Sequence, residues 1–206
     1  MRIFSLAFAL LVLLTPMAQA QENPEQQQAV KTVEDYLGGL TTLKAHFVQT
    51  ANDGKQLTGT FYLDRPGKMR INYDPPVTDF IVADGLLVYY YDGQMKQQSN
   101  TPISRSLADF FLRKTVKLSG DISVSDMKKD KNTLQMTLVQ TKNPLAGSLT
   151  LVLSENPLQL QEWRIVDAQG LVTGVKLSDV TTGITLDSDL FHYYDPAHKA
   201  HLYNKN

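Results

Sequence analysis

The sequence predicts a mainly β protein whose strands form one curved antiparallel sheet or barrel, wound as a meander. Three observations support this fold class. Short segments of alternating or continuous apolar residues recur along most of the chain. Turn-forming dipeptides separate them, at Asp84-Gly85, Asp92-Gly93, Asn156-Pro157 and Gln169-Gly170. Two segments alone show helical spacing, so the expected strands far outnumber the expected helices.

The first twenty residues have the pattern of a secretory signal peptide. Arg2 supplies a positive start, residues 3–14 are apolar, Pro16 breaks the run, and Ala18-Gln19-Ala20 is a small-residue cleavage site. The apolar run is short for a bilayer span and no stop-transfer pattern follows it, which argues against the alternative of an uncleaved anchor. We therefore expect removal of residues 1–20 and export of 21–206 as a single domain.

Composition excludes several reactions and partners. The chain has no cysteine, so thiol chemistry, disulfides and a lipid attached through a cysteine thioether are excluded. Lys and Arg number 20 and Asp and Glu number 21, a formal net charge of −1 without a basic cluster. Nucleic acid is therefore not an expected partner, and no polybasic segment would hold the protein on an anionic membrane.

Two segments, near residues 25–40 and 103–113, are expected to be helical. In the first, apolar residues follow 3-4-3 spacing, and Gly38-Gly39 would loosen or end the helix. In the second, Pro102 stands at the start and basic residues occupy the last turn. The apolar faces consist of Val30, Val33, Leu37 and Leu40 in the first helix and of Ile103, Leu107, Phe110 and Phe111 in the second.

Ten segments are expected to be strands because they are short, apolar in pattern and bounded by turn signals. They are residues 43–50, 56–63, 68–73, 79–83, 86–91, 133–140, 148–153, 160–166, 171–177 and 183–188. The fifth, "LLVYYY", is apolar at both parities, so both faces of this strand should be covered. Either a helix packs outside an ordinary core or the inner face lines a ligand cavity, and periodicity does not distinguish the two.

The segment that begins at Arg65, "RPGKMRINYDPP", places a charge where the pattern expects an apolar residue. Phe61 and Leu63 form the apolar side of the preceding strand, and Arg65 is next on that side. A two-residue Pro-Gly turn would pair Leu63 with Arg70, whereas pairing Leu63 with Met69 needs a wider loop or a bulge. Arg65 is thus expected where the strand ladder is irregular.

Sequence signatures of serine hydrolases, zinc proteases, phosphate-binding loops and dinucleotide-binding folds are absent. We therefore expect no enzymatic activity and no cofactor. His192, His198 and His201 gather near the C-terminus. Their spacing matches no class of metal site, so a solvated tail is the preferred interpretation and no metal ligand is assigned.

The stretch "GTFYLDRPGKMRINYDPP", followed by "DFIVADG", "YYYD" and "QQ", resembles the periplasmic outer-membrane lipoprotein carrier family, the LolA-like proteins. The resemblance extends upstream to Phe47-Val48-Gln49 and downstream through "GSLTLVLSENPLQLQEWRIVDAQGLVTGVKLSDV" and "LFHYYDP". It covers nearly all of residues 21–206 in the expected order.

This resemblance implies a single open, incomplete antiparallel β-barrel covered by an α lid of short helices, with an apolar cavity between them. It implies a periplasmic carrier that accepts acylated lipoproteins from an inner-membrane lipoprotein-releasing ABC transporter and shields their acyl chains. Delivery to the outer membrane follows, where a lipoprotein receptor is a further expected partner. We expect the carrier itself to be a monomer.

The family has an arginine before the proline of this turn, and the resemblance implies that Arg65 is a lid latch. Its five N–H donors suit the free carbonyls at the end of a lid helix. The alternative is an ordinary turn residue with its head in solvent. Relatives often carry an aromatic residue four positions later, where this chain has Met69. The candidate cavity residues, chosen by apolar parity or helix face, are Phe47, Phe61, Leu63, Met69, Ile71, Tyr73, Leu107, Phe110, Phe111 and Trp163.

Two other functions remain open at this point. Periplasmic sensors of envelope stress use the same architecture to bind lipid or misfolded protein, although they usually carry an additional domain. This chain ends soon after its last expected strand, which favours the carrier. The third function is carriage of another lipid, such as a glycolipid.

Overall fold

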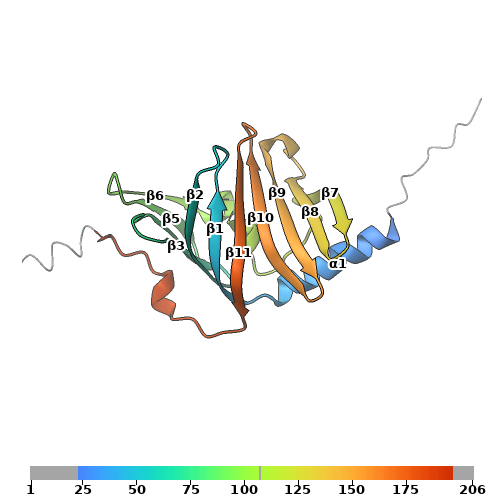
Figure 1. The fold of residues 1–206 in the computed structure, drawn as a ribbon, viewed down its shortest axis with the longest axis horizontal. Coiled ribbons are helices and arrows are strands. Elements are labelled where there is room, and N and C mark those ends of the chain that lie inside the picture. The colour runs from blue at the N-terminus through green and yellow to red at the C-terminus, as the bar shows by residue number, and fades with distance from the viewer. Residues whose placement is uncertain (1–22, 107, 197–206) are drawn as a thin grey trace, which may run out of the picture.

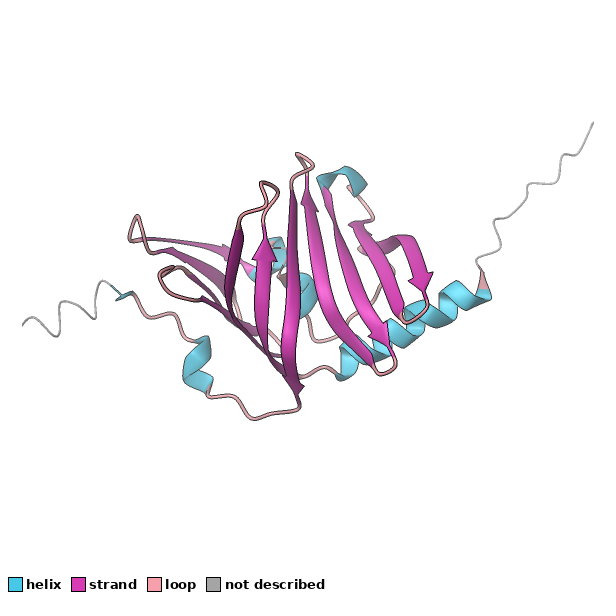
Figure 2. Ribbon diagram, viewed as in Figure 1, coloured by secondary structure: helices cyan, strands magenta, loops and turns pink. Residues whose placement is uncertain are grey.

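In a computed structural model, residues 23–106 and 108–196 are described, and they form one antiparallel sheet of eleven strands (Figures 1 and 2). The order across the sheet is β6-β5-β4-β3-β2-β1-β11-β10-β9-β8-β7. Two meanders therefore meet where β1 pairs with β11. β6 and β7 are the edges and do not pair with each other, so the sheet curves without closing. This confirms the mainly β fold and the open antiparallel sheet.

The strands are β1 Thr42–Thr50, β2 Gln56–Asp64, β3 Lys68–Tyr73, β4 Phe80–Asp84, β5 Leu87–Asp92, β6 Gln97–Pro102, β7 Ile122–Asp130, β8 Thr133–Gln140, β9 Gly147–Glu155, β10 Leu158–Asp167 and β11 Val172–Thr182. The helices are α1 Pro24–Gly39 and α2 Asp109–Leu112, with 3-10 turns η1 Ile103–Arg105, η2 Pro144–Ala146 and η3 Ser188–Phe191. No helix within the described ranges is both long and apolar enough to cross a membrane.

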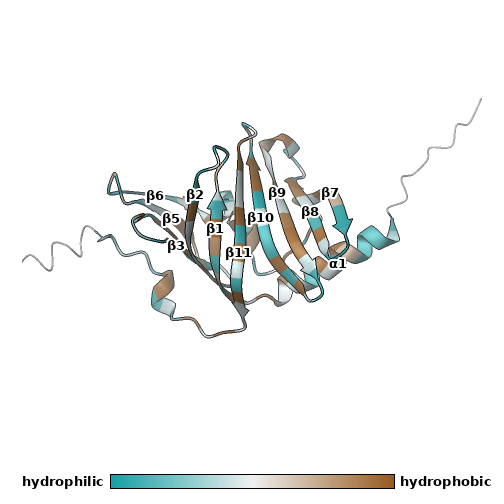
Figure 3. Cartoon of the chain, in the orientation of Figure 1, coloured by the Kyte–Doolittle hydropathy of each residue, from teal (hydrophilic) through white to brown (hydrophobic). Residues whose placement is uncertain are grey.

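Alternating side chains give the sheet one apolar face. In β1 the buried positions Leu43, Ala45 and Phe47 alternate with the exposed Lys44 and His46. β2 and β8 show the same alternation of buried and more exposed residues. Brown and teal residues alternate along β1, β11 and β10 in Figure 3. Because successive side chains point to opposite faces, the main core lies on the inner face of the curved sheet.

Helix α1 confirms the first predicted helix. Asn23 caps it, since its side chain accepts a hydrogen bond of 3.0 Å from the N–H of Glu25, and Pro24 occupies the first turn, where a missing N–H costs little. Val33 and Leu37, one turn apart, are the buried residues of its apolar face. The helix ends at the glycine pair, as the sequence indicates.

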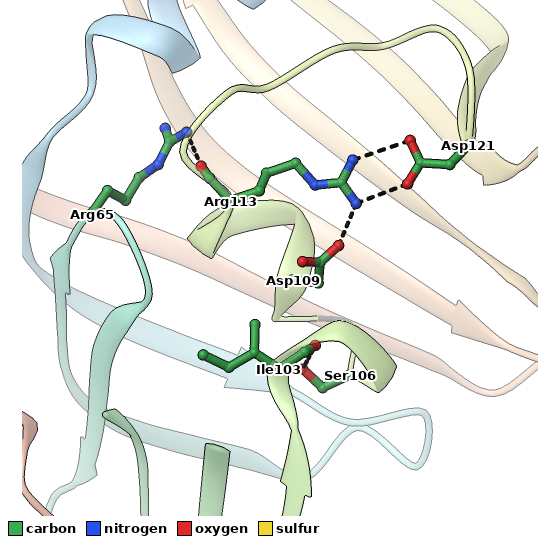
Figure 4. Close-up of polar contacts among 6 residues, drawn as sticks. All are labelled: Arg65, Ile103, Ser106, Asp109, Arg113 and Asp121. Atoms are coloured by element: carbon green, nitrogen blue, oxygen red, sulfur yellow. Dashed lines mark hydrogen bonds and ion pairs between the residues drawn. The ribbon is translucent and has the colours of Figure 1, made fainter. Parts of the chain in front are cut away.

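The prediction of one helix over residues 103–113 is wrong. The segment instead contains the turn η1 and the single-turn helix α2. Ser106 interrupts it, because its backbone is extended and both its N–H and its hydroxyl donate to the carbonyl of Ile103, each at 2.9 Å (Figure 4). A serine that bonds its local backbone in this way competes with helix formation. Leu107 lies outside the described residues.

Sequence periodicity does not predict β6 and β7, the two edge strands. β6 is polar and exposed, and in β7 a register shift after Val124 breaks the alternation of the apolar residues Ile122, Val124 and Met127. The predicted strand over residues 183–188 is wrong. β11 ends at Thr182, opposite the start of its partner β1, and Gly183 then turns the chain with a φ of +69°.

The C-terminal segment covers the outer face of β4 and β5, which explains the apolar character of "LLVYYY" on both faces. Tyr193 stacks on Tyr89, with ring centroids 4.9 Å apart, and lies 5.9 Å from the ring of Phe80. Arg70 lies over the Phe80 ring at 4.9 Å and donates 3.1 Å to the carbonyl of Leu190. The outer cover is thus η3 and the extended chain after it.

Phe191 anchors this cover, being 1% exposed although it lies outside the main core cluster. We expect Phe191→Ala to lower the free energy of unfolding by about 3–5 kcal/mol, because it leaves a cavity under the C-terminal segment. Urea unfolding measures the change. Leu86→Ala, at an 80% exposed residue, is the control and should change stability by less than about 0.5 kcal/mol. Equal stability of the two variants would show that the segment does not pack as described.

Candidate functional site: an apolar interior under a lid

The inner face of the sheet is covered by α1 and by the segment 103–121, which together form a lid. Lid and sheet share one core cluster, to which the lid contributes Val33, Leu37, Phe110, Leu112, Val116 and Leu118. Of the residues predicted to line a cavity, six are at most 6% exposed, namely Phe47, Phe61, Leu63, Met69, Phe110 and Trp163. Three others pack against the cluster, namely Ile71, Tyr73 and Phe111. Leu107 is the one that falls outside the described residues.

Rings from the lid and from the sheet meet at Trp163. Its ring centroid lies 5.4 Å from that of Phe61 in β2 and 5.1 Å from that of Phe111 in the lid. Phe111 in turn meets Phe110 edge-on at 5.3 Å. The lid's own rings therefore occupy the apolar interior in this structure, and any guest there has to displace them.

A second ring pair fixes the residues of the "FVQ" motif. Phe47 and Tyr73 meet edge-on at 5.6 Å, and the Tyr73 hydroxyl donates 3.0 Å to the side-chain oxygen of Gln49. Burial raises the pKa of Tyr73, although the hydrogen bond to Gln49 opposes this shift. The tyrosine thus stays neutral and serves as an apolar wall with its polar end satisfied.

Two hollows adjoin the lid. One, of about 480 Å³, lies between lid residues 104–113 and strands β7 to β10. Phe110 belongs to its wall as well as to the core, so this hollow adjoins the ring cluster. The other, of about 660 Å³, lies between α1 and the β7–β8 hairpin. Apart from Phe110, neither hollow is lined by the residues predicted to form the cavity.

Arg65 begins a three-residue loop between β2 and β3. Leu63 pairs with Met69 and Asp64 with Lys68, so the wider loop is the correct alternative. Gly67 closes the loop with a φ of +84°, a conformation that glycine adopts without strain. Because Arg65 stands outside the ladder, the alternation of the strand does not dictate where its side chain points.

The Arg65 guanidinium reaches the ends of both lid helices. Nη1 donates to the carbonyl of Leu37 and, at 3.3 Å, to that of Leu40, at the end of α1. Nη2 donates 2.7 Å to the carbonyl of Arg113, just after α2 (Figure 4). Burial lowers the pKa of Arg65, yet arginine stays protonated in proteins. A permanent cation therefore donates to carbonyls at and just after the C-terminal ends of both helices, where the helix dipole favours positive charge.

The same loop and the Arg113 side chain provide further polar contacts to the lid. The N–H of Gly67 donates 2.9 Å to the carbonyl of Leu112. The Arg113 guanidinium bonds Asp109, one turn earlier, and donates at 3.2 and 3.0 Å to the two carboxylate oxygens of Asp121 (Figure 4). Burial lowers the pKa of Arg113, but its bonds to the two aspartates outweigh this and raise it. Arg113 thus ties α2 to the start of β7.

Helix α1 has two further polar anchors. Glu34 accepts a hydrogen bond of 2.7 Å from the N–H of Leu118 and one of 3.0 Å from Nζ of Lys117. The hydroxyl of Tyr36 accepts a bond of 2.9 Å from the N–H of Leu160 in β10. Burial raises the pKa of Tyr36, while this bond opposes the rise.

These polar lid residues were not predicted from the sequence. The Asp109–Arg113 pair has the i, i+4 spacing of a helical ion pair and could have been found by that signal. Glu34 and Leu118 are 84 residues apart in the chain, and no sequence pattern connects them.

The histidine group is not assembled in the part of the chain that the structure describes. His192 lies at the end of η3, with Nδ1 3.2 Å from the carbonyl oxygen of Ser188, whereas His198 and His201 lie outside the described residues. Within the described ranges, no group of three or more His, Asp or Glu residues could hold a metal ion.

Comparison with known proteins places this geometry in a family. A family model described as outer membrane lipoprotein carrier protein LolA matches residues 38–194. An outer-membrane lipoprotein carrier protein of Methylococcus capsulatus is 26% identical over 188 residues, covering 87% of this chain and 88% of the relative. Another, of Pseudomonas paraeruginosa, is 28% identical over 204 residues, covering 93% and 94%.

A crystal structure of a LolA superfamily protein from Nitrosomonas europaea is also similar, with a TM-score of 0.46 and 10% identity, covering 80% of this chain and 97% of that one. The family model spans both the Arg65 loop and the strands that surround Trp163. The protein belongs to the outer membrane lipoprotein carrier protein LolA family.

Proposed function

We propose that this protein is a periplasmic carrier that binds the acyl chains of lipoproteins between its sheet and its lid. The observation that carries the proposal is the Arg65 side chain, which bonds the ends of both lid helices above an interior filled by apolar rings. The names of the relatives support the same role. Arg65 is the latch of the lid, and the predicted apolar residues form the surface that acyl chains contact once the lid has moved.

The need for such a carrier follows from the cost of exposing acyl chains to water. Each buried methylene is worth about 0.8 kcal/mol, so one chain of ~16 carbons represents roughly 12 kcal/mol. A carrier has to offer apolar surface of comparable worth and still release its cargo. An interior filled by the lid's own rings meets both needs, because the rings return when the acyl chain leaves.

The proposed route begins with a signal peptide at residues 1–20, which lie outside the described residues, and leaves residues 21–206 as one carrier domain in the periplasm. An inner-membrane lipoprotein-releasing ABC transporter supplies the acylated lipoprotein. Delivery is to the outer membrane, where a receptor lipoprotein is the proposed acceptor. The carrier works as a monomer and needs no cofactor.

Arg65→Leu tests the latch. The variant loses charge-assisted hydrogen bonds worth about 1.5–3 kcal/mol each and gains apolar surface, and both changes favour the open, loaded state. We expect normal loading with lipoprotein and a fall of roughly tenfold or more in the rate of transfer to acceptor membranes, consistent with the loss of one such bond. Arg65→Lys should restore transfer only partly, because an ammonium group lacks the planar fork of donors.

The matched control is Arg164→Leu, which removes an arginine from the strand position next to Trp163, on the opposite face of the sheet. It should transfer lipoprotein like the wild type. If Arg65→Leu also transfers normally, Arg65 is only a turn residue.

Trp163, the single tryptophan of the chain, reports where the acyl chain binds. Its ring contacts both the lid and β2, so a chain that replaces Phe111 comes within contact distance of the indole. We expect a brominated acyl probe to quench Trp163 fluorescence strongly. An unbrominated probe of the same length should compete with the brominated probe for the site and restore the fluorescence. Binding of the brominated probe without quenching would place the acyl site away from Trp163.

The same architecture also suits a periplasmic lipid sensor or a carrier of a different lipid. Depletion of the protein with pulse-labelling of lipoproteins separates these functions. For a lipoprotein carrier we expect labelled lipoproteins to accumulate at the inner membrane. Altered transcription with normal lipoprotein localisation would indicate a sensor instead. Native mass spectrometry of protein purified from the periplasm would identify a glycolipid or another lipid cargo.

A further inference from the structure

The two parts of the lid are distant in sequence but bonded to each other directly. Glu34, on α1, accepts hydrogen bonds from the backbone N–H of Leu118 and from the Lys117 ammonium group. Arg65 joins the same two parts from the other side, through the carbonyls at the ends of α1 and α2. The lid is therefore tied together at two separate places.

The hydrogen bond from the Leu118 N–H to Glu34 is better shielded from solvent than the ion pair between Lys117 and Glu34. The Glu34 side chain is 13% exposed, whereas that of Lys117 is 61% exposed, so solvent screens the ion pair. The residues around the bonded N–H are buried in the core, Val116 being 4% exposed and Leu118 3%. A shielded carboxylate bonded to a backbone N–H makes a strong contact, and separation leaves both groups without that partner.

We propose that Glu34 is a positioning residue that joins α1 and the segment 103–121 into one unit, so that both parts of the lid leave the sheet together. This inference rests on the proposed function, since it concerns how the carrier opens. If α1 moved alone, its carboxylate would lose the Leu118 N–H, and if the other segment moved alone, that N–H would lose its acceptor. Movement as one unit keeps this contact and breaks the bonds to Arg65 at both helix ends.

One consequence is that a guest need not touch α1 to release it. An acyl chain that enters beside Phe110 displaces the segment 103–121, and Glu34 transmits this movement to α1. The carbonyls of Leu37 and Arg113 then leave Arg65 in the same event. Opening is all-or-none, because the bonds from Arg65 to the ends of α1 and α2 break together.

Amide hydrogen exchange without any lipid tests the coupling. The N–H of Leu160 in β10 donates to the Tyr36 hydroxyl of α1 and reports the separation of that helix from the sheet. The N–H of Gly67 bonds the carbonyl of Leu112 and reports the other part of the lid. In the wild type we expect equal protection of these two amides, below that of the amides in β1 and β9, because one opening event exposes both.

In Glu34→Ala we expect the two amides to differ in protection by about 10- to 100-fold, as the loss of a hydrogen bond to a charged group implies. Glu34→Gln keeps an oxygen for the Leu118 N–H and should preserve most of the coupling. Asp35→Ala is the matched control, since it removes an exposed carboxylate from the next position of α1. It should leave the two amides equally protected.

Two results would overturn the inference. One is unequal protection of the Leu160 and Gly67 amides in the wild type, and the other is equal protection in Glu34→Ala. General destabilisation by Glu34→Ala would lower the protection of both amides, and of β1 and β9, without separating the two. The measurement needs no cargo, so its outcome is independent of the lipoprotein transfer assay that tests the proposed function.

Discussion

The hydrogen bonds from Arg65 to the ends of two lid helices are the interaction on which the lid arrangement depends. A guanidinium at the edge of an apolar interior needs acceptors, and the unpaired carbonyls at helix ends are suitable ones. Meeting this need requires the three-residue loop that frees Arg65 from the strand ladder. It also requires α1 to end near Leu40 and α2 to end at Leu112, so that their last carbonyls face the same side chain.

The division between polar and apolar contacts defines how the lid can move. Phe110 and Phe111 fill the interior beside Trp163, and an acyl chain in their place would replace one apolar filling by another. Such an exchange avoids the cost of an empty cavity. The polar contacts that Arg65 and Gly67 make with the lid have no counterpart in an acyl chain. The free energy that keeps the lid closed therefore resides mainly in these few directional bonds.

Much of the fold could be predicted because a strand with one buried face has an apolar residue at every second position. β1 and β2 follow from that period, and α1 follows from its helical spacing and its glycines. The edge strands β6 and β7 could not be predicted, because β6 is polar and is held by backbone bonds, while an irregularity after Val124 interrupts the apolar pattern of β7. The helix expected over residues 103–113 failed at Ser106, where a local side-chain bond to the carbonyl of Ile103 prevails over apolar spacing.

For the site, the sequence by itself determined which side chains are apolar and that Arg65 interrupts their pattern. It thus identified the aromatic residues that contact Trp163 and the unusual position of the Arg65 charge. Only the tertiary structure decided what these residues meet: that Arg65 bonds both lid helices, that Arg113 bonds Asp121, and that Glu34 bonds Leu118. The physical reason is that the two kinds of information depend on different distances along the chain. Burial acts on each residue through its own polarity, whereas a hydrogen bond depends on the position of two groups that the chain order leaves far apart.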